Sequence, residues 1–327
     1  MTMPFGPNWL LLHAGALGDL VLAVQLLLRM PAARRAERIE VLSRADLGEL
    51  TACNPSIVRR SIEGIGSHWL FAAEPDSPPS ALASAIEGRN VVGLLAERES
   101  GVHARLAQLS PARLFSVDPR PRPGDRAHIV DQWQAELERQ GAVFESCVRK
   151  RAAAAQIGVP ESLRSRGREL LRAVMDVRIE PVLIHPGSGS PRKNWPLAGF
   201  LAVADRLRGL SIPVCFLVGE VEQERWSDSD VARLRETSPV IVTPTAADLA
   251  AILSTGGLLI GNDSGPSHLA ALLGTPTLTL FGPTDPALWR PLGPQATFLR
   301  GPQPEIEGWG LTIDRVHGAA VDAFGLT

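Results

Sequence analysis

Residues Leu258–Pro294 read LLIGNDSGPSHLAALLGTPTLTLFGPTDPALWRPLGP, and this stretch decides the fold. An apolar strand, a polar turn, a helical apolar pattern and a second β-rich run follow one another in it, at Leu258–Gly261, Asn262–Pro266, His268–Leu273 and Thr277–Phe281. This order predicts a βαβ unit. A helix that begins after such a turn leaves backbone N–H groups directed at the turn, and with the helix dipole they favour a phosphate there. The stretch therefore predicts a nucleotide site.

A second segment, Val182–Phe200, reads VLIHPGSGSPRKNWPLAGF. Its apolar strand runs into a glycine- and serine-rich loop, which suits the close approach of an anion. Pro196 is placed to open a helix that continues to Leu210, so Lys193 lies at a strand-to-helix junction. Lys193 is one of two lysines among 33 lysines and arginines, so a compact ammonium at this point indicates a chemical role. A solvated loop cation is the alternative interpretation.

The third segment lies near the start, at Trp9–Met30, WLLLHAGALGDLVLAVQLLLRM. A short apolar strand meets Gly15 and Gly18, and Asp19 then stands at the N-terminal end of a helix. Asp19 fits an N-cap, because aspartate is favoured at that position. It also follows the first strand, and in open parallel sheets the carboxyl ends of the strands face the ligand. Both interpretations remain open.

The length and composition favour a globular protein with two domains. The 327 residues and the 45% hydrophobic content suffice for two packed cores, and the net charge of −2 gives no reason to expect a nucleic-acid partner. Cys53, Cys147 and Cys215 are far apart, which predicts neither a disulfide framework nor a zinc site and fits a reducing cytoplasm. No signal peptide or membrane span is expected, and the apolar run Leu20–Leu28 is interpreted as core.

Apolar runs that alternate with helical patterns predict a parallel sheet in each half of the chain. We place the boundary after Gly158, so that the first domain covers residues 1–158 and the second 159–327, with a closing helix at about 312–324. The predicted strands are Leu10–His13, Ile39–Leu42, Val91–Leu95, Leu114–Val117, Val182–His185, Val214–Val218, Val240–Val242, Leu258–Ile260 and Thr277–Phe281.

Four motifs stand in a specific order along nearly the whole chain. They are ALGD at Ala16–Asp19, HPGSGSPRKNWP at His185–Pro196, GEVE at Gly219–Glu222 and DSGPSHLAALLGTPTLTLFGPTDPALWRP at Asp263–Pro291. In these motifs the chain resembles glycosyltransferase family 9, the ADP-heptose:lipopolysaccharide heptosyltransferases. The resemblance implies a GT-B fold, in which two Rossmann-like parallel-sheet domains face a central cleft that closes for catalysis. It also implies an acceptor-binding first domain and a donor-binding second domain.

The resemblance further implies roles for individual residues. Asp19 is expected to be the general base and Lys193 to contact the donor phosphates, so that these two are the catalytic residues. His13 and Gly18 are expected on the acceptor or donor-sugar side. The residues expected to bind the donor nucleotide are Ser188, Gly189, Ser190, Lys193, Glu222, Asp263, Ser264, Gly265, His268, Thr284 and Asp285.

Some of these positions have simpler interpretations. Asp263, Ser264 and Gly265 also suit an Asx turn and helix cap, whatever the ligand. Glu222 fits a contact to the ribose hydroxyls or a solvated acidic loop, and His268 fits a ligand contact or a packed, hydrogen-bonded ring.

One departure from the family concerns His13, which stands six residues before Asp19, where relatives often carry a lysine or arginine. His13 either changes the contacts to the substrate or merely ends the first strand. Because of this change, the identity of the transferred sugar stays open, with heptose as the expectation.

The expected function is inverting, metal-independent transfer of a sugar from ADP-heptose to a saccharide or lipid-linked glycan such as lipopolysaccharide core. No resident cofactor and no metal are expected, and a lipid-linked acceptor would bring the enzyme to the cytoplasmic face of the inner membrane. A nucleotide-sugar epimerase or hydrolase of the same fold is one alternative. A noncatalytic nucleotide-binding homologue is the other.

Overall fold

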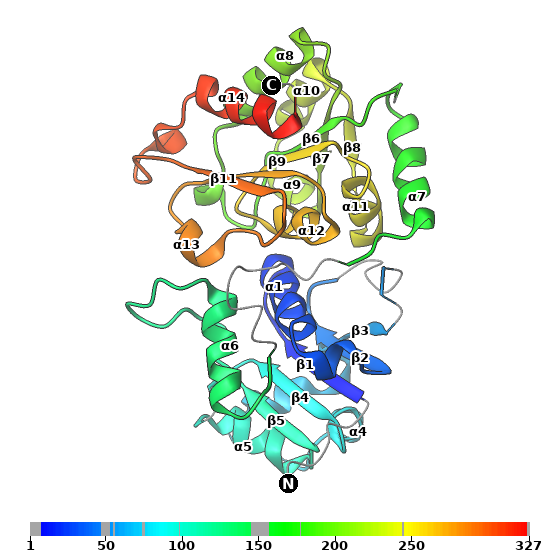
Figure 1. Cartoon of the computed structure of the whole chain (residues 1–327), viewed down its shortest axis with the longest axis vertical. Coiled ribbons are helices and arrows are strands. Elements are labelled where there is room, and N and C mark those ends of the chain that lie inside the picture. The colour runs from blue at the N-terminus through cyan, green and yellow to red at the C-terminus, as the bar shows by residue number, and fades with distance from the viewer. Residues whose placement is uncertain are drawn as a thin grey trace. The chain divides into compact units, whose positions relative to one another are not determined.

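The computed structural model describes residues 8–46, 53–54, 56–73, 76–97, 99–144, 157–176, 178–243 and 245–325. The chain divides into two compact units, the first with the described residues 8–46 and 54–144 and the second with Cys53 and residues 157–325 (Figure 1). Each unit is built on one parallel sheet, which confirms the predicted α/β class. Residues 145–156 lie outside the described part, and the expected boundary between residues 158 and 159 stays a prediction.

The sheet of the first unit has the strand order β3-β2-β1-β4-β5, and all its pairs are parallel. Leu11 in the central strand faces Val41 on one side and Val92 on the other. Near-continuous apolar runs are expected here, because helices cover both faces of a parallel sheet. The strands are β1 (Asn8–His13), β2 (Arg38–Ser43), β3 (Ile57–Ser61), β4 (Asn90–Leu94) and β5 (Arg113–Ser116).

The helices of the first unit connect these strands. The segment Leu20–Leu28 is buried, as expected for a helix packed on a sheet. The α-helices are α1 (Leu17–Leu28), α2 (Pro31–Arg34), α4 (Ser80–Ile86), α5 (Gly101–Gln108) and α6 (Ile129–Arg139), and the 3₁₀ helices are η1 (Glu63–Ile65) and η2 (Ser67–Phe71).

The second sheet has the order β11-β10-β9-β6-β7-β8, again all parallel. Counted from β6, this is the 3-2-1-4-5-6 order of dinucleotide-binding folds, with its topological switch point between β6 and β9. The strands are β6 (Val182–His185), β7 (Val214–Val218), β8 (Val240–Val242), β9 (Leu258–Asn262), β10 (Thr277–Phe281) and β11 (Ala296–Arg300).

Helices of the second unit pack on this sheet, and α14 lies beside α8 in Figure 1. The expected closing helix is confirmed, with Thr312 as its N-cap, accepting a hydrogen bond from the Arg315 N–H. The helices are α7 (Glu161–Arg172), η4 (Pro191–Lys193), α8 (Leu197–Gly209), α9 (Glu220–Arg225), α10 (Asp228–Thr237), α11 (Ala246–Leu253), α12 (Gly265–Leu273), α13 (Pro286–Trp289), η5 (Glu307–Gly310) and α14 (Ile313–Phe324). No helix in the described part of the chain has the length and apolar character needed to cross a bilayer.

Two strands escape the sequence prediction, and both are edge strands. β3 has the sequence IVRRS and becomes more exposed toward its end, while all five residues of β11 are half-buried or exposed. Edge strands need only one covered side, so their sequences carry polar residues that weaken the apolar signal.

Candidate functional site

The switch point of the first sheet lies between β1 and β4, and His13 is the last residue of β1. Its ring is buried, and its Nδ1 accepts a hydrogen bond of 3.2 Å from the Gly15 N–H. Burial lowers the pKa of His13 to about 4, so the imidazole is neutral at neutral pH. His13 thus differs in charge from the lysine or arginine that the family resemblance implies for this position.

Asp19 lies in the first turn of α1, at its third residue, directly after Gly18. The N-cap position belongs to Ala16, so the interpretation of Asp19 as the N-cap is wrong. A Cβ added to Gly15 would lie 2.6 Å from the His13 Cε1 and 3.1 Å from the Asp19 Oδ2. The missing side chain at Gly15 therefore allows an imidazole and a carboxylate to approach the same point of the backbone.

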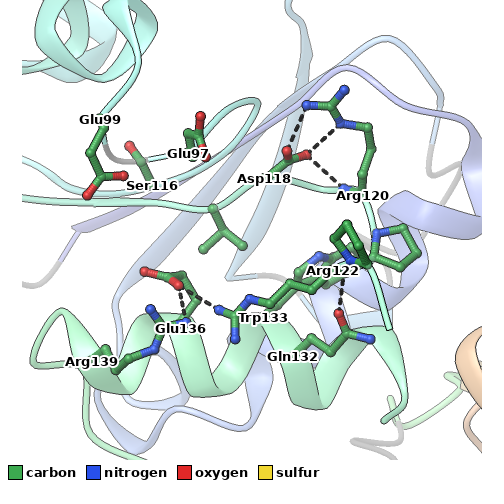
Figure 2. Close-up of a pocket in the computed structure, with 13 residues that line it drawn as sticks. Glu97, Glu99, Ser116, Asp118, Arg120, Arg122, Gln132, Trp133, Glu136 and Arg139 are labelled. Carbon is green, nitrogen blue, oxygen red and sulfur yellow. Dashed lines mark hydrogen bonds and ion pairs between the residues drawn. The ribbon is translucent and has the colours of Figure 1, made fainter. Parts of the chain in front are cut away.

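A cavity of about 330 Å³ opens at the carboxyl ends of β4 and β5 in the first unit (Figure 2). We call it the β5–α6 cavity, because the loop after β5 and one face of α6 form its walls. Sequence analysis missed it. Its lining residues are Glu97, Glu99, Ser116, Val117, Asp118, Arg120, Pro121, Arg122, Pro123, Gln132, Trp133, Glu136 and Arg139.

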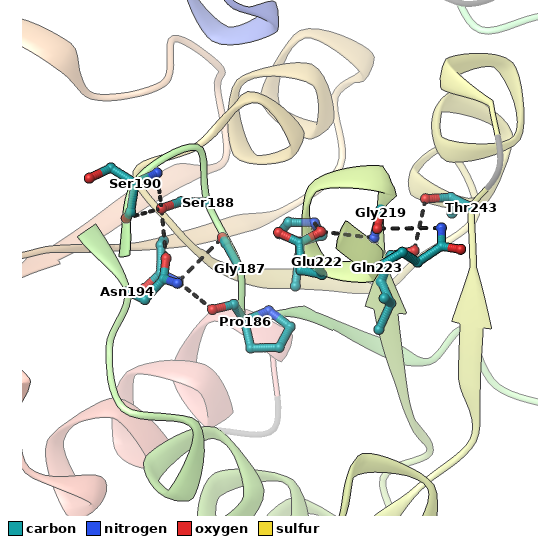
Figure 3. A network of polar contacts seen from close by, with 12 residues as sticks. Pro186, Gly187, Ser188, Ser190, Asn194, Gly219, Glu222, Gln223 and Thr243 are labelled. Atoms are coloured by element: carbon teal, nitrogen blue, oxygen red, sulfur yellow. Dashed lines mark hydrogen bonds and ion pairs between the residues drawn. The ribbon is translucent and has the colours of Figure 1, made fainter. Parts of the chain in front are cut away.

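In the second unit, the loop after β6 is held by its own side chains (Figure 3). The Ser188 hydroxyl lies 2.6 Å from the Asn194 Oδ1 and 2.7 Å from the Ser190 carbonyl oxygen, and the Ser190 N–H donates to it over 3.2 Å. A Cβ on Gly189 would meet nothing within 4 Å. The loop thus has a fixed base and an open side, as an anion-binding loop requires.

Asn262, at the end of β9, ties this loop to the neighbouring strand. Its side chain is fully buried, and its Oδ1 accepts from the Trp195 N–H at 2.9 Å. Its Nδ2 donates to the carbonyl oxygens of Pro186 at 2.8 Å and Gly187 at 3.4 Å. One amide therefore fixes both ends of the segment that carries Lys193. Sequence analysis assigned Asn262 only turn chemistry and missed this function.

Asp263 gathers three of the predicted residues around its carboxylate. Lys193 Nζ lies 2.9 Å from its Oδ2, and the Thr284 hydroxyl donates to the same oxygen over 2.8 Å. His268 Nε2 is 3.7 Å from Oδ1, which is longer than a hydrogen bond. Burial opposes ionisation of Asp263, but the contacts with His268 and Lys193 outweigh it and lower the pKa to about 2. Asp263 is therefore a carboxylate at any physiological pH.

Ser264 and Gly265 begin the helix α12 beside this cluster. Ser264 occupies the N-cap position, but its side chain makes no capping hydrogen bond. Its Oγ is buried and has no hydrogen-bond partner among the residues that the structure describes. The simple cap interpretation is thus wrong for the Ser264 side chain. A buried donor without a partner, at the positive end of a helix, is what an anion site offers.

Glu222 is buried, which makes the interpretation as a solvated acidic loop wrong. Its Oε2 accepts a 2.9 Å hydrogen bond from the Gly219 N–H and lies 3.5 Å from the His185 Nε2. Burial opposes the charge, but the contacts with His185 and the Gly219 N–H outweigh it and lower the pKa. A Cβ on Gly187 would come within 1.8 Å of the Glu222 Oε1, so the loop and this carboxylate pack directly together.

Asp285 is a predicted site residue whose side chain makes its hydrogen bonds outside the Asp263 cluster. It caps α13 by accepting from the Ala287 N–H at 3.0 Å, and Arg300 Nη1 donates to the same oxygen over 3.3 Å. Its neighbour Thr284 joins the Asp263 cluster instead. Among the described residues, no group of three or more His, Cys, Asp or Glu side chains could hold a metal ion.

Comparison with known proteins gives relatives at the levels of sequence and fold. The model of the family "Glycosyltransferase family 9 (heptosyltransferase)" matches residues 123–307. Lipopolysaccharide heptosyltransferase 3 of Escherichia coli is 34% identical over 135 residues, which are 40% of this chain and 39% of that protein. Lipopolysaccharide heptosyltransferase 1 of Pseudomonas aeruginosa is 32% identical over 165 residues, which are 49% of this chain and 43% of that protein. The aligned segments thus span about two fifths of these relatives.

Solved structures resemble the whole chain. The family 9 glycosyltransferase from Veillonella parvula has a TM-score of 0.71 at 21% identity, and the match covers 98% of both chains. The E. coli heptosyltransferase WaaC with ADP has a TM-score of 0.64 at 18% identity, with 97% of this chain and 99% of that chain covered. At these identities the likeness shows the fold, and it agrees with the two parallel-sheet units described above.

Proposed function

Because the chain belongs to glycosyltransferase family 9, we propose that it is an inverting glycosyltransferase that moves a sugar from a nucleoside diphosphate to a saccharide acceptor. The proposed donor is ADP-heptose, and the proposed acceptor is a glycan such as lipopolysaccharide core, after the heptosyltransferases to which the chain is similar. The proposal includes action in the cytoplasm, which the free thiol of the buried Cys215 fits.

The observation that carries this proposal is the cluster at the switch point of the second sheet. Lys193 supplies a cation on Asp263, and it remains 36% exposed and so can reach a ligand. Ser264 adds a buried hydroxyl without a partner among the described residues, at the start of the nine-residue helix α12. A diphosphate needs this combination of cation, hydrogen-bond donors and helix N-terminus.

Loss of the nucleotide is the step that this cluster would promote. As the bond between the anomeric carbon and the phosphate oxygen breaks, negative charge grows on the diphosphate, and Lys193 with the N–H groups of α12 stabilises it. The proposal needs no metal for this step, because the protein itself supplies the positive charge.

Asp19 is the proposed general base. Its carboxylate takes the proton of the acceptor hydroxyl as that oxygen bonds to the anomeric carbon from the face opposite the departing nucleotide, which inverts the configuration. The products are the glycosylated acceptor, ADP and one proton on Asp19. His13 is neutral and therefore places no positive charge beside this carboxylate.

The first test is calorimetric titration with ADP, UDP, GDP and ADP-heptose, with and without divalent metal. We expect selective ADP binding that does not require metal. Lys193→Ala should weaken it about tenfold, because a charge-assisted contact is lost. An unchanged dissociation constant in Lys193→Ala would remove this residue from the site. Preference for UDP or GDP would replace the proposed donor, and no nucleotide binding would favour a noncatalytic homologue.

The second test concerns the base. Asp19→Asn should keep the ADP affinity but lower the rate of sugar transfer about a hundredfold or more, because general-base catalysis is lost. A fully active Asp19→Asn enzyme would refute the assignment. Release of free sugar from ADP-heptose at the same rate with and without any saccharide acceptor would instead indicate a hydrolase.

A further inference from the structure

The β5–α6 cavity is a preformed pocket in the first unit. Ser116, at the end of β5, is fixed on three sides: the Gln140 side chain binds its N–H and its carbonyl oxygen over 3.0 and 2.8 Å, and His103 Nδ1 lies 2.8 Å from its hydroxyl oxygen. The loop that follows is tied to α6, because the Arg122 N–H donates to the Gln132 Oε1 over 2.9 Å. The walls therefore need little ordering when a ligand binds.

Charged groups line this cavity, and its four carboxylates outnumber its three arginines (Figure 2). Arg120 donates through Nε and Nη2 to Asp118 over 3.0 and 2.7 Å, which holds the pKa of that carboxyl below its usual range. Arg122 Nη2 lies 2.6 Å from the Glu136 Oε2, and Arg139 pairs with the same carboxylate. Among the described lining residues, every guanidinium thus has a carboxylate partner.

Two carboxylates of the lining are placed differently. The side chains of Glu97 and Glu99 are exposed and make no side-chain hydrogen bond or close ion pair with another described residue, although the charge of Glu97 acts on Arg120. Their carboxylate oxygens can accept hydrogen bonds from a ligand. Apolar surface from Val117, Pro121 and Pro123 lines the same space. Carboxylate acceptors beside apolar surface suit a molecule that carries many hydroxyl groups as well as C–H faces.

We propose that the β5–α6 cavity binds an uncharged sugar residue of the acceptor and disfavours a sugar that carries a phosphate or carboxylate. An anionic sugar would face four carboxylates and only three guanidinium groups, so the net negative charge of the lining opposes its binding. A neutral sugar can donate its hydroxyl hydrogens to Glu97 and Glu99 and leave all three arginine pairs intact.

The position of the cavity supports this assignment, which rests on the proposed function for the role of the acceptor. β5 is separated from β1 only by β4, so its end lies about 10 Å across the sheet from the strand that precedes Asp19. A sugar in the cavity would therefore belong to the same oligosaccharide as the reacting hydroxyl, one or two residues away from it. The cavity would select the acceptor by a sugar that does not itself react.

Sugar binding can be measured without any transfer reaction. We suggest ligand-observed saturation-transfer NMR on the full chain with lactose and cellobiose as neutral probes and with glucuronate and glucose 6-phosphate as anionic ones. The neutral probes should bind at least about tenfold more tightly than the anionic ones. Equal or tighter binding of the anionic probes, or no binding of the neutral ones, would overturn the proposal.

The variant for this test is the double substitution Glu97→Gln and Glu99→Gln. It should weaken the neutral probes about tenfold, because two carboxylate acceptors become weaker amides. Glu87→Gln is the matched control, since Glu87 is an exposed carboxylate of the same unit outside the cavity. Equal sugar affinity in the double variant and in the wild type would refute the assignment.

ADP calorimetry on the same proteins separates this inference from the proposed function. If ADP binds but the double variant leaves sugar binding unchanged, the cavity assignment fails and the donor site stands. If neutral sugars bind through Glu97 and Glu99 but no nucleotide binds, the glycosyltransferase proposal fails and the sugar site stands.

Discussion

Replacing Asn262 by alanine tests whether one buried amide positions the nucleotide-binding loop. The side chain is fully buried and makes hydrogen bonds to the Trp195 N–H and to the carbonyl oxygens of Pro186 and Gly187. Alanine removes all three and leaves one buried donor, the Trp195 N–H, and two carbonyl acceptors, of Pro186 and Gly187, without this partner. At about 1–3 kcal/mol for each of the two groups bonded at 2.9 and 2.8 Å, the free energy of unfolding should fall by about 2–6 kcal/mol. This is a sizeable part of the roughly 5–15 kcal/mol free energy of unfolding of a typical protein, so urea unfolding has to show that the variant is folded before its ADP affinity is compared.

The same substitution should weaken ADP binding, although Asn262 need not touch the nucleotide. Without its amide, the segment from Pro186 to Trp195 is no longer fixed at both ends, and binding has to order it. Ordering one residue costs about 1–2 kcal/mol, which corresponds to about a tenfold rise in the dissociation constant. Urea unfolding gives the stability and calorimetry gives the affinity.

Asn90→Ala is the matched control, because Asn90 is an equally buried asparagine in the sheet of the first unit. It should reduce stability without changing ADP affinity. If Asn262→Ala binds ADP as tightly as the wild type, the loop holds its shape without this amide and the positioning argument is refuted. Equal losses of affinity in both variants would attribute the effect to general destabilisation.

Three further predictions concern charge and packing. The pKa of Asp263 is lowered from 3.8 to about 2, so the ionised side chain stabilises the folded protein by about 2 kcal/mol above pH 4, and this contribution is lost as the pH falls to 2. Urea unfolding of the wild type and of Asp263→Asn should show the loss. A difference in stability that does not change with pH would contradict it. The pKa of His13 is lowered from 6.5 to about 4, so the free energy of unfolding of the wild type should fall by about 3 kcal/mol relative to His13→Gln as the pH drops from 6.5 to 4; the same pH dependence of urea unfolding in both proteins would contradict this. Gly187→Ala should lower the free energy of unfolding by about 1–3 kcal/mol, because the added Cβ would collide with Glu222. Gly189→Ala should leave it nearly unchanged, because the space around Gly189 is open. Thermal or urea unfolding measures both, and equal losses of stability would refute the packing argument.

The central strands could be predicted from the sequence, because parallel strands that are buried on both faces consist of uninterrupted apolar runs. The predicted bounds of Val182–His185, Val214–Val218 and Thr277–Phe281 are those of the structure. The edge strands β3 and β11 were missed because their polar residues resemble those of a loop. Hydrophobic periodicity cannot distinguish an edge strand from a loop when only the hydrogen bonds to one neighbouring strand define the edge strand.

The sequence indicated which residues lie together where a short motif keeps them adjacent in the chain, as at Asp263 and Ser264, and their role in binding stays a prediction. Glu222 could not be placed, because only burial against Gly187 distinguishes it from a solvated loop acid, and burial depends on a distant segment. The β5–α6 cavity gave no signal for the same reason. Its walls come from the segments after β4 and β5 and from α6, and no single segment resembles a binding motif.

The switch points of the two sheets differ in the charges that surround them. At the switch point of the second sheet, a lysine and the N-terminus of α12 offer positive charge, which suits a diphosphate. At that of the first sheet, Asp19 lies near a His13 ring that burial keeps neutral, where the family resemblance implies a lysine or arginine. A cation beside a carboxylate opposes its protonation. If Asp19 is the base proposed above, a neutral imidazole removes that opposition, and it offers no attraction to an anionic acceptor. The β5–α6 cavity does not restore that attraction, because four carboxylates line it and only three arginines, and both features are consistent with the uncharged acceptor sugar proposed above.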